Sequence, residues 1–85
     1  MPEKIAIGKV SHYFSKIGVA VIDLTKEIKV GDKISIEGRG QAVQQVVSSM
    51  EVEHNKVTVA GNGSSIGMKI VQPVKEGDAV FKLLA

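Results

Sequence analysis

The sequence predicts a small all-β domain, either a sandwich or a barrel of about seven short strands. Helical periodicity is nearly absent, whereas apolar residues alternate with polar ones or form short runs. Glycine-containing turn signals recur every several residues. With 85 residues, we expect one domain, residues 1–85. A barrel is favoured because closure removes exposed strand edges, which helps a small domain that has no disulfide.

The first two expected strands carry two predictions, a bulge in the first and burial of both faces of the second. In the strand expected at residues 4–14, the apolar residues change face near Gly8, which predicts a β-bulge. The strand expected at 17–24 is apolar on both faces, with Val19 and Val21 on one of them. Such a run predicts either burial on both sides or a partner that covers one face.

Turn residues separate the later strands. These strands are expected at residues 33–37, 41–53, 57–60, 66–71 and 79–84. Glycine and asparagine accept positive φ, so residues 38–40 and 61–63 are predicted to be tight turns. The dipeptides Gly31-Asp32 and Gly77-Asp78 each enter a strand, and we interpret this echo as local turn chemistry.

Composition indicates which residue types build the core and in which cellular compartment the protein works. The only aromatic residues are Tyr13, Phe14 and Phe81, so the core is expected to be aliphatic, built on valine and isoleucine. Without cysteine, a signal peptide pattern or a long apolar run, the sequence predicts a cytoplasmic protein that meets no membrane. A net charge of +2, spread along the chain, permits contact with a polyanion but does not require it.

Motifs for catalysis, metals and nucleotides are missing. The only histidines, His12 and His54, stand far apart, and no serine or carboxylate has triad or metal-ligand spacing with them. The glycine-rich stretch 61–67 departs from the dinucleotide motif and precedes a strand, whereas phosphate binding needs a helix N-terminus. We therefore expect no enzyme activity, no cofactor, no metal and no nucleotide bound by this chain alone.

One grouping of basic and aromatic residues is compatible with RNA. Nucleic-acid surfaces combine basic side chains with aromatic rings on which bases stack. The candidate RNA-binding residues are Lys9, His12, Tyr13, Lys16 and Arg39. The alternative is structural: Phe14 fills the core while Tyr13 caps one end of the barrel.

The ordered series of glycine-bounded strands resembles a known family over nearly the whole chain. The segments that carry it are residues 7–14, 17–22, 28–36, 43–50, 60–61, 66–70 and 74–81. They resemble domain 2 of the translational GTPases, the β-barrel shared by elongation factor Tu and initiation factor 2. The resemblance is closer to the small stand-alone elongation factor-like proteins of bacteria and archaea, and it extends to barrels appended to some U32 peptidase-like proteins.

This resemblance implies a small closed six- to seven-stranded antiparallel β-barrel, Greek-key-like, that contacts tRNA, rRNA or the ribosome. Phe14-Ser15 matches a step of the family's aminoacyl pocket, but Ser11-His12-Tyr13 stands where the family has an acidic pair. The chain has no GTPase domain, so any GTP-driven cycle would use another protein.

Two functions follow as expectations. The first is a non-enzymatic module that binds RNA or the translation machinery, with no DNA partner. The alternative is a protein-protein interaction adaptor for a separately encoded U32 peptidase-like or GTPase partner. Its contact patch would consist of Val43, Val47 and Val71, which lie on otherwise polar faces.

Overall fold

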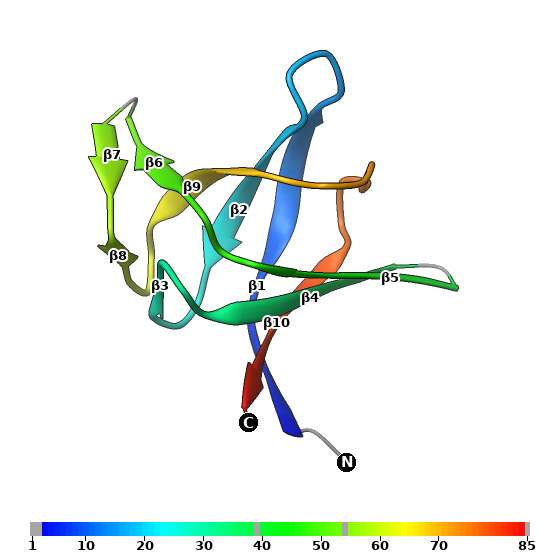
Figure 1. The fold of residues 1–85 in the computed structure, drawn as a ribbon, viewed down its shortest axis with the longest axis horizontal. Coiled ribbons are helices and arrows are strands. Elements are labelled where there is room, and N and C mark those ends of the chain that lie inside the picture. The colour runs from blue at the N-terminus through cyan, green and yellow to red at the C-terminus, as the bar shows by residue number, and fades with distance from the viewer. Residues whose placement is uncertain (1–2, 39, 54, 85) are drawn as a thin grey trace.

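The computed structural model describes residues 3–38, 40–53 and 55–84, and these ranges contain strands and turns but no helix (Figure 1). The strands are β1 (Glu3–Phe14), β2 (Val19–Leu24), β3 (Ile28–Lys29), β4 (Lys33–Gly38), β5 (Gln41–Val46), β6 (Met50–Val52), β7 (Asn55–Val57), β8 (Val59–Ala60), β9 (Ser65–Lys69) and β10 (Ala79–Leu84). The all-β prediction is therefore confirmed. In the part of the chain that the structure describes, there is no helix able to span a bilayer.

Eight of the strands form one antiparallel sheet in the order β5-β4-β10-β1-β2-β9-β6-β7. The hairpins β1–β2, β4–β5 and β6–β7 pair strands that follow one another in the chain. β10 inserts between β4 and β1, and β9 inserts between β2 and β6. The short strands β3 and β8 form a separate pair. This order brings β2, β9 and β6 side by side, although β9 comes after both in the chain (Figure 1).

The predicted closed barrel is wrong. In the described ranges no ladder joins β5 to β7, so both are edges of an open sheet. One side chain of β5 instead reaches the end of β9 and the residues after it. The Gln45 amide accepts a hydrogen bond from Val71 N at 2.9 Å and donates one to Lys69 O at 2.9 Å. Beyond β5, Val47 exchanges backbone hydrogen bonds with the turn at Gly31 and Asp32. A side chain therefore provides bonds that a further strand would supply in a closed barrel.

β1 curves through two bulges, one of which the sequence predicts. Its register shifts at Ile7 against β10, next to Gly8, and again at Ser11 against β2. Gly8 is required there because a Cβ at this position would overlap the carbonyl oxygen of Asp23. The bulges place inward-facing residues three positions apart, since Ile7 and Val10 are both buried.

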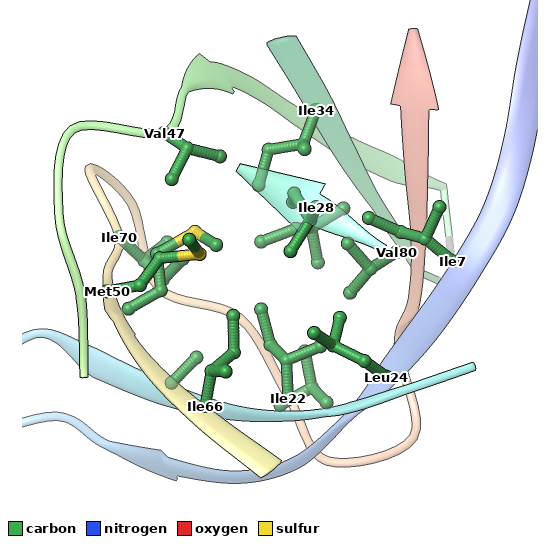
Figure 2. Packing of buried hydrophobic residues seen from close by; sticks show 14 of the residues in the cluster. Ile7, Ile22, Leu24, Ile28, Ile34, Val47, Met50, Ile66, Ile70 and Val80 are labelled. Carbon is green, nitrogen blue, oxygen red and sulfur yellow. The ribbon is translucent and has the colours of Figure 1, made fainter. Parts of the chain in front are cut away.

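The core is aliphatic, as predicted. It contains seven isoleucines and two methionines among the buried residues. Figure 2 shows Ile22 of β2, Ile66 of β9 and Ile34 of β4 pointing into one shared interior. No described aromatic ring is fully buried: Phe14 is 44% exposed, and Tyr13 only packs against the core from its margin. Phe14 therefore does not fill the core.

The two Gly-Asp dipeptides form turns of the same type. Asp32 N donates to Lys29 O and Asp78 N donates to Lys75 O, each at 3.1 Å. In both turns an Asp Oδ2 accepts from the backbone N of the lysine, at 3.0 and 2.9 Å. Glycine precedes each aspartate with φ of 98° and 91°, as a type II turn requires. The interpretation as local turn chemistry is confirmed.

Candidate functional site

The outer face of the sheet at β1, β2, β9 and β6 carries a surface of paired apolar and polar residues. Residues directly opposite each other in a ladder point to the same face. One row across the strands consists of Phe14, Val19 and Lys69. The next row consists of His12, Val21, Gly67 and Glu51. Ile22 and Ile66 point inward (Figure 2), so their neighbours Val21 and Gly67 face outward.

A groove of about 460 Å³ lies on this face. Its size falls within the range of about 300–1,000 Å³ that is usual for ligand pockets. The lining residues are Phe14, Ile17, Val19, Val21, Ser49, Glu51, Glu53, Ser65, Ile66, Gly67 and Lys69. The groove thus has an apolar floor, an apolar end and an acidic flank. It is the candidate functional site, and we call it the Gly67 groove.

Gly67 opens the groove, and the fold does not require a glycine there. A Cβ at Gly67 would lie 3.6 Å from Val19 Cγ1 and 4.0 Å from Glu51 O, which is ordinary van der Waals contact. The backbone has no positive φ at this residue. Glycine inside a strand weakens the strand and often marks close approach by a ligand or another backbone. A missing side chain here therefore leaves a hollow above the apolar floor.

The two ends of the groove differ in polarity. Ile17, 61% exposed, and Phe14 form an apolar end at the β1–β2 turn. At the other end the Ser65 hydroxyl donates to Asp23 Oδ1 at 2.7 Å. In a Ser-His-Asp triad the serine hydroxyl donates to a histidine. His12 instead contacts Glu76 Oε2 through Nδ1 at 2.9 Å.

Glu51 and Glu53 form the acidic flank. Among the described ion pairs neither carboxylate takes part. Glu53 has φ of 50°, the only positive φ of a non-glycine residue in the described ranges. It directly follows β6 and is a turn residue, and positive φ is more usual for Asn and Gly. The groove lining holds these two carboxylates and the single cation Lys69, whereas the whole chain has a net charge of +2.

A second polar cluster lies on the outer side of β1, β10 and β4. Lys4 Nζ contacts both carboxylate oxygens of Glu37 at 2.7 Å, and Ser35 Oγ donates to Glu37 Oε2 at 3.0 Å. These hydrogen bonds, from Lys4 first and then Ser35, hold the pKa of Glu37 below its ordinary 4.5. Lys4 also lies 4.6 Å from the centre of the Phe81 ring. With its groups satisfied by one another, this cluster joins strands and offers no open site.

The predicted RNA-binding residues do not form one stripe. Lys9 and His12 lie on the outer face, whereas Tyr13 pairs with buried Ala20 and packs against the core on the opposite side. His12 and Tyr13 are consecutive in β1 and therefore point to opposite faces, and the bulge at Ser11 puts Lys9 on the face of His12. Lys16 is exposed in the turn after β1, and Arg39 lies outside the described residues.

The predicted adaptor patch is wrong at two of its three positions. Val43 and Val47 are buried, at 4% and 1% exposure, and only Val71 is exposed, at 70%. In the described part of the chain, no group of three or more His, Asp or Glu side chains could hold a metal ion.

The sequence signal for the groove was the second apolar face of β2. Alternation with Ile66 and Met68 assigns Gly67 to the outer face, but it does not show which strands lie beside it.

Known proteins that resemble this chain are proteases. It is 41% identical over 81 residues to an uncharacterized protease of Methanocaldococcus jannaschii. It is 32% identical over 82 residues to a collagenase of Porphyromonas gingivalis. Each match covers 94% of this chain, but the chain spans about a fifth of each relative's length (20%). No protein-family model matches.

Solved structures with the same fold come from the same class of protein. Two crystal structures show the C-terminal domain of a Geobacillus thermoleovorans protein assigned to the U32 peptidases. The first has a TM-score of 0.85 at 19% identity and covers 89% of this chain and 96% of that domain. The second has a TM-score of 0.86 at 20% identity, with 91% and 90% covered.

These comparisons overturn the resemblance to a stand-alone elongation factor-like protein. The similar proteins are proteases and collagenases, and the similar structures are a peptidase's C-terminal domain, not domain 2 of a translational GTPase. RNA binding, which depended on that resemblance, is not supported. The Gly-Asp turns that carried it are a local solution for entering a strand. Such turns recur wherever the backbone needs them, so they do not specify a partner.

Proposed function

We propose that this chain is a non-catalytic interaction module that acts with the catalytic body of a U32-type peptidase. The observation that carries the proposal is the match of 94% of the chain to one fifth (20%) of a protease. Most of that protease lies outside the matched stretch and is available for the chemistry. A module of this size would then supply binding and orientation, which lower the barrier by holding reactants in place.

The Gly67 groove supports the proposal, because it is an open surface with the features of a binding site. It combines apolar floor residues with a few polar groups at its margin, as ligand-binding clefts do. His12 contacts Glu76 and the Ser65 hydroxyl donates to Asp23, so these described polar groups do not form a serine–histidine pair and support binding better than catalysis.

A domain exchange tests the proposal. The P. gingivalis collagenase would be made in three forms: intact, without the stretch that matches this chain, and with this chain in place of that stretch. We expect the deletion to raise the KM for gelatin, and the exchange to restore it, since the module contributes to binding. This chain alone should hydrolyse no gelatin. Hydrolysis by the chain alone, or equal kinetics in all three forms, would contradict the proposal.

A further inference from the structure

We propose that the Gly67 groove binds an extended polypeptide segment that carries an apolar side chain with lysine or arginine beside it. This inference rests on the proposed function, and it names the class of ligand that the module would present or hold. It starts from Gly67, because the fold gives no steric or conformational reason for a glycine at that position.

The hollow above Gly67 defines where the apolar side chain would lie. Val19 and Val21 form the floor beside it, and both are half-buried although they face outward. Phe14 and Ile17 extend the apolar surface at one end. A side chain of leucine size would bury its surface against these groups, at roughly 25 cal/mol for each Å² removed from water.

The flank of the groove defines the charge of the ligand. Glu51 pairs directly with Gly67 across the β6–β9 ladder, so its carboxylate borders the hollow. Glu53 follows two residues later and also lines the groove. Lysine and arginine have long apolar stems and a charged end, so they can cross the floor and reach these carboxylates. A polyanion would meet like charge at this flank.

The shape of the groove favours an extended segment. The floor residues Val19 and Val21 are two positions apart on β2, whereas Glu51 lies on β6 and Glu53 in the turn after it. An extended chain advances about 3.3 Å per residue, so its alternate side chains repeat at the same two-residue spacing. A ligand segment lying along β9 would therefore place alternate side chains beside Val19 and Val21 while it passes the carboxylate of Glu51.

The first test uses three synthetic peptides and the unmodified chain, uniformly labelled with ¹⁵N. One peptide has a central leucine flanked by lysines, the second has glutamates in place of the lysines, and the third has serine in place of the leucine. We expect the leucine–lysine peptide to shift the amide signals of Gly67, Val19 and Glu51. The other two should bind at least about tenfold more weakly. Equal binding of all three peptides, or shifts centred away from these residues, would overturn the inference.

The second test fills the groove. Gly67→Leu should weaken binding of the leucine–lysine peptide about tenfold or more without unfolding the chain, since a Cβ fits there. Gly61→Leu is the matched control, because a Cβ at Gly61 meets nothing within 4 Å and Gly61 lies outside the groove lining. Unchanged affinity in Gly67→Leu would overturn the inference.

The third test removes the charge of the flank. The double variant Glu51→Gln with Glu53→Gln should weaken binding and reduce its dependence on salt, whereas Glu27→Gln, an exposed residue outside the groove, should do neither. Self-association through the groove, seen by light scattering, would identify a second copy as the occupant and contradict the inference. So would tighter binding of an oligouridylate than of the peptide.

The two proposals fail separately. If no peptide binds the chain, but the collagenase still needs this module for a low KM, the inference about the groove is wrong and the proposed function stands. If the exchange has no effect on the collagenase while the peptide binds at Gly67, the groove is confirmed and the link with a U32-type peptidase is wrong.

Discussion

At the scale of single residues, Gln45 of β5 connects its strand to a segment far along the chain. Its amide makes the two hydrogen bonds that a neighbouring strand would otherwise make, one with Val71 N and one with Lys69 O. Both ends of an amide are needed, because one group accepts and the other donates. The side chain thus connects the edge of β5 to the segment that follows β9.

Replacement of Gln45 tests this role. Gln45→Ala should lower the free energy of unfolding by about 1–2 kcal/mol, the usual cost of losing one or two net hydrogen bonds. Gln44→Ala, at an exposed neighbour on the same strand, should change it by less than about 0.5 kcal/mol. Urea denaturation of both variants measures the difference. Equal stability of the two variants would show that the amide contributes nothing.

Glu37 makes the stability of the domain dependent on pH. Its pKa is lowered in the folded chain by hydrogen bonds from Lys4 and Ser35. A carboxyl group with a lowered folded pKa contributes stability above its unfolded pKa and loses it as pH falls through the folded value. The loss should therefore occur below about pH 4.5.

Lys4→Met provides the comparison for this pH dependence. Without the ammonium group, the folded pKa of Glu37 moves back toward its ordinary value, so the variant should lose less stability than the wild type below that pH. Urea unfolding at a series of acidic pH values measures both curves. Parallel curves for the two proteins would contradict the assignment.

At the scale of elements, two glycines in different strands of the same sheet have opposite roles. Gly8 lies at a bulge of β1 where any side chain would overlap Asp23 O, whereas Gly67 in β9 has room for one. Gly8→Ala should therefore destabilise the chain by about 1–3 kcal/mol, as overpacking does. Gly67→Ala should stabilise it by about 0.5–1 kcal/mol, because glycine is unfavourable inside a strand. Thermal unfolding of the two variants gives the signs directly, and a destabilised Gly67→Ala would mean that the fold itself needs this glycine.

Strand positions follow from the sequence where alternation is strong. The strand expected at 79–84 coincides with β10, and that at 4–14 differs from β1 by one residue. The long strand expected at 41–53 is instead β5 and β6, separated at residues 47–49. The chain must break there because β5 pairs with β4, whereas β6 pairs with β9 farther along the sheet. Pairing between distant segments decides this break, and no local pattern records it.

At the scale of the whole molecule, the sequence predicted the aliphatic core and the all-β class but not the open sheet. Closure was expected because a small domain gains from having no edges. Here the Gln45 side chain links β5 to the end of β9 and to Val71 without a ladder. The site was predicted only in part. The outward face of Val19 and Val21 was visible as a second apolar face, but the hollow at Gly67 exists only because β2, β9 and β6 are neighbours.

The central claim is that the Gly67 groove binds polypeptide for a catalytic body. Groove variants of the exchanged collagenase measure it most directly. In the collagenase that carries this chain, the kinetics of gelatin hydrolysis would be compared for Gly67→Leu and Gly61→Leu. If the groove binds polypeptide for the catalytic body, Gly67→Leu should raise KM about tenfold with kcat unchanged, and Gly61→Leu should change neither. Equal KM in the two variants, or a fall in kcat with KM unchanged, would contradict the account.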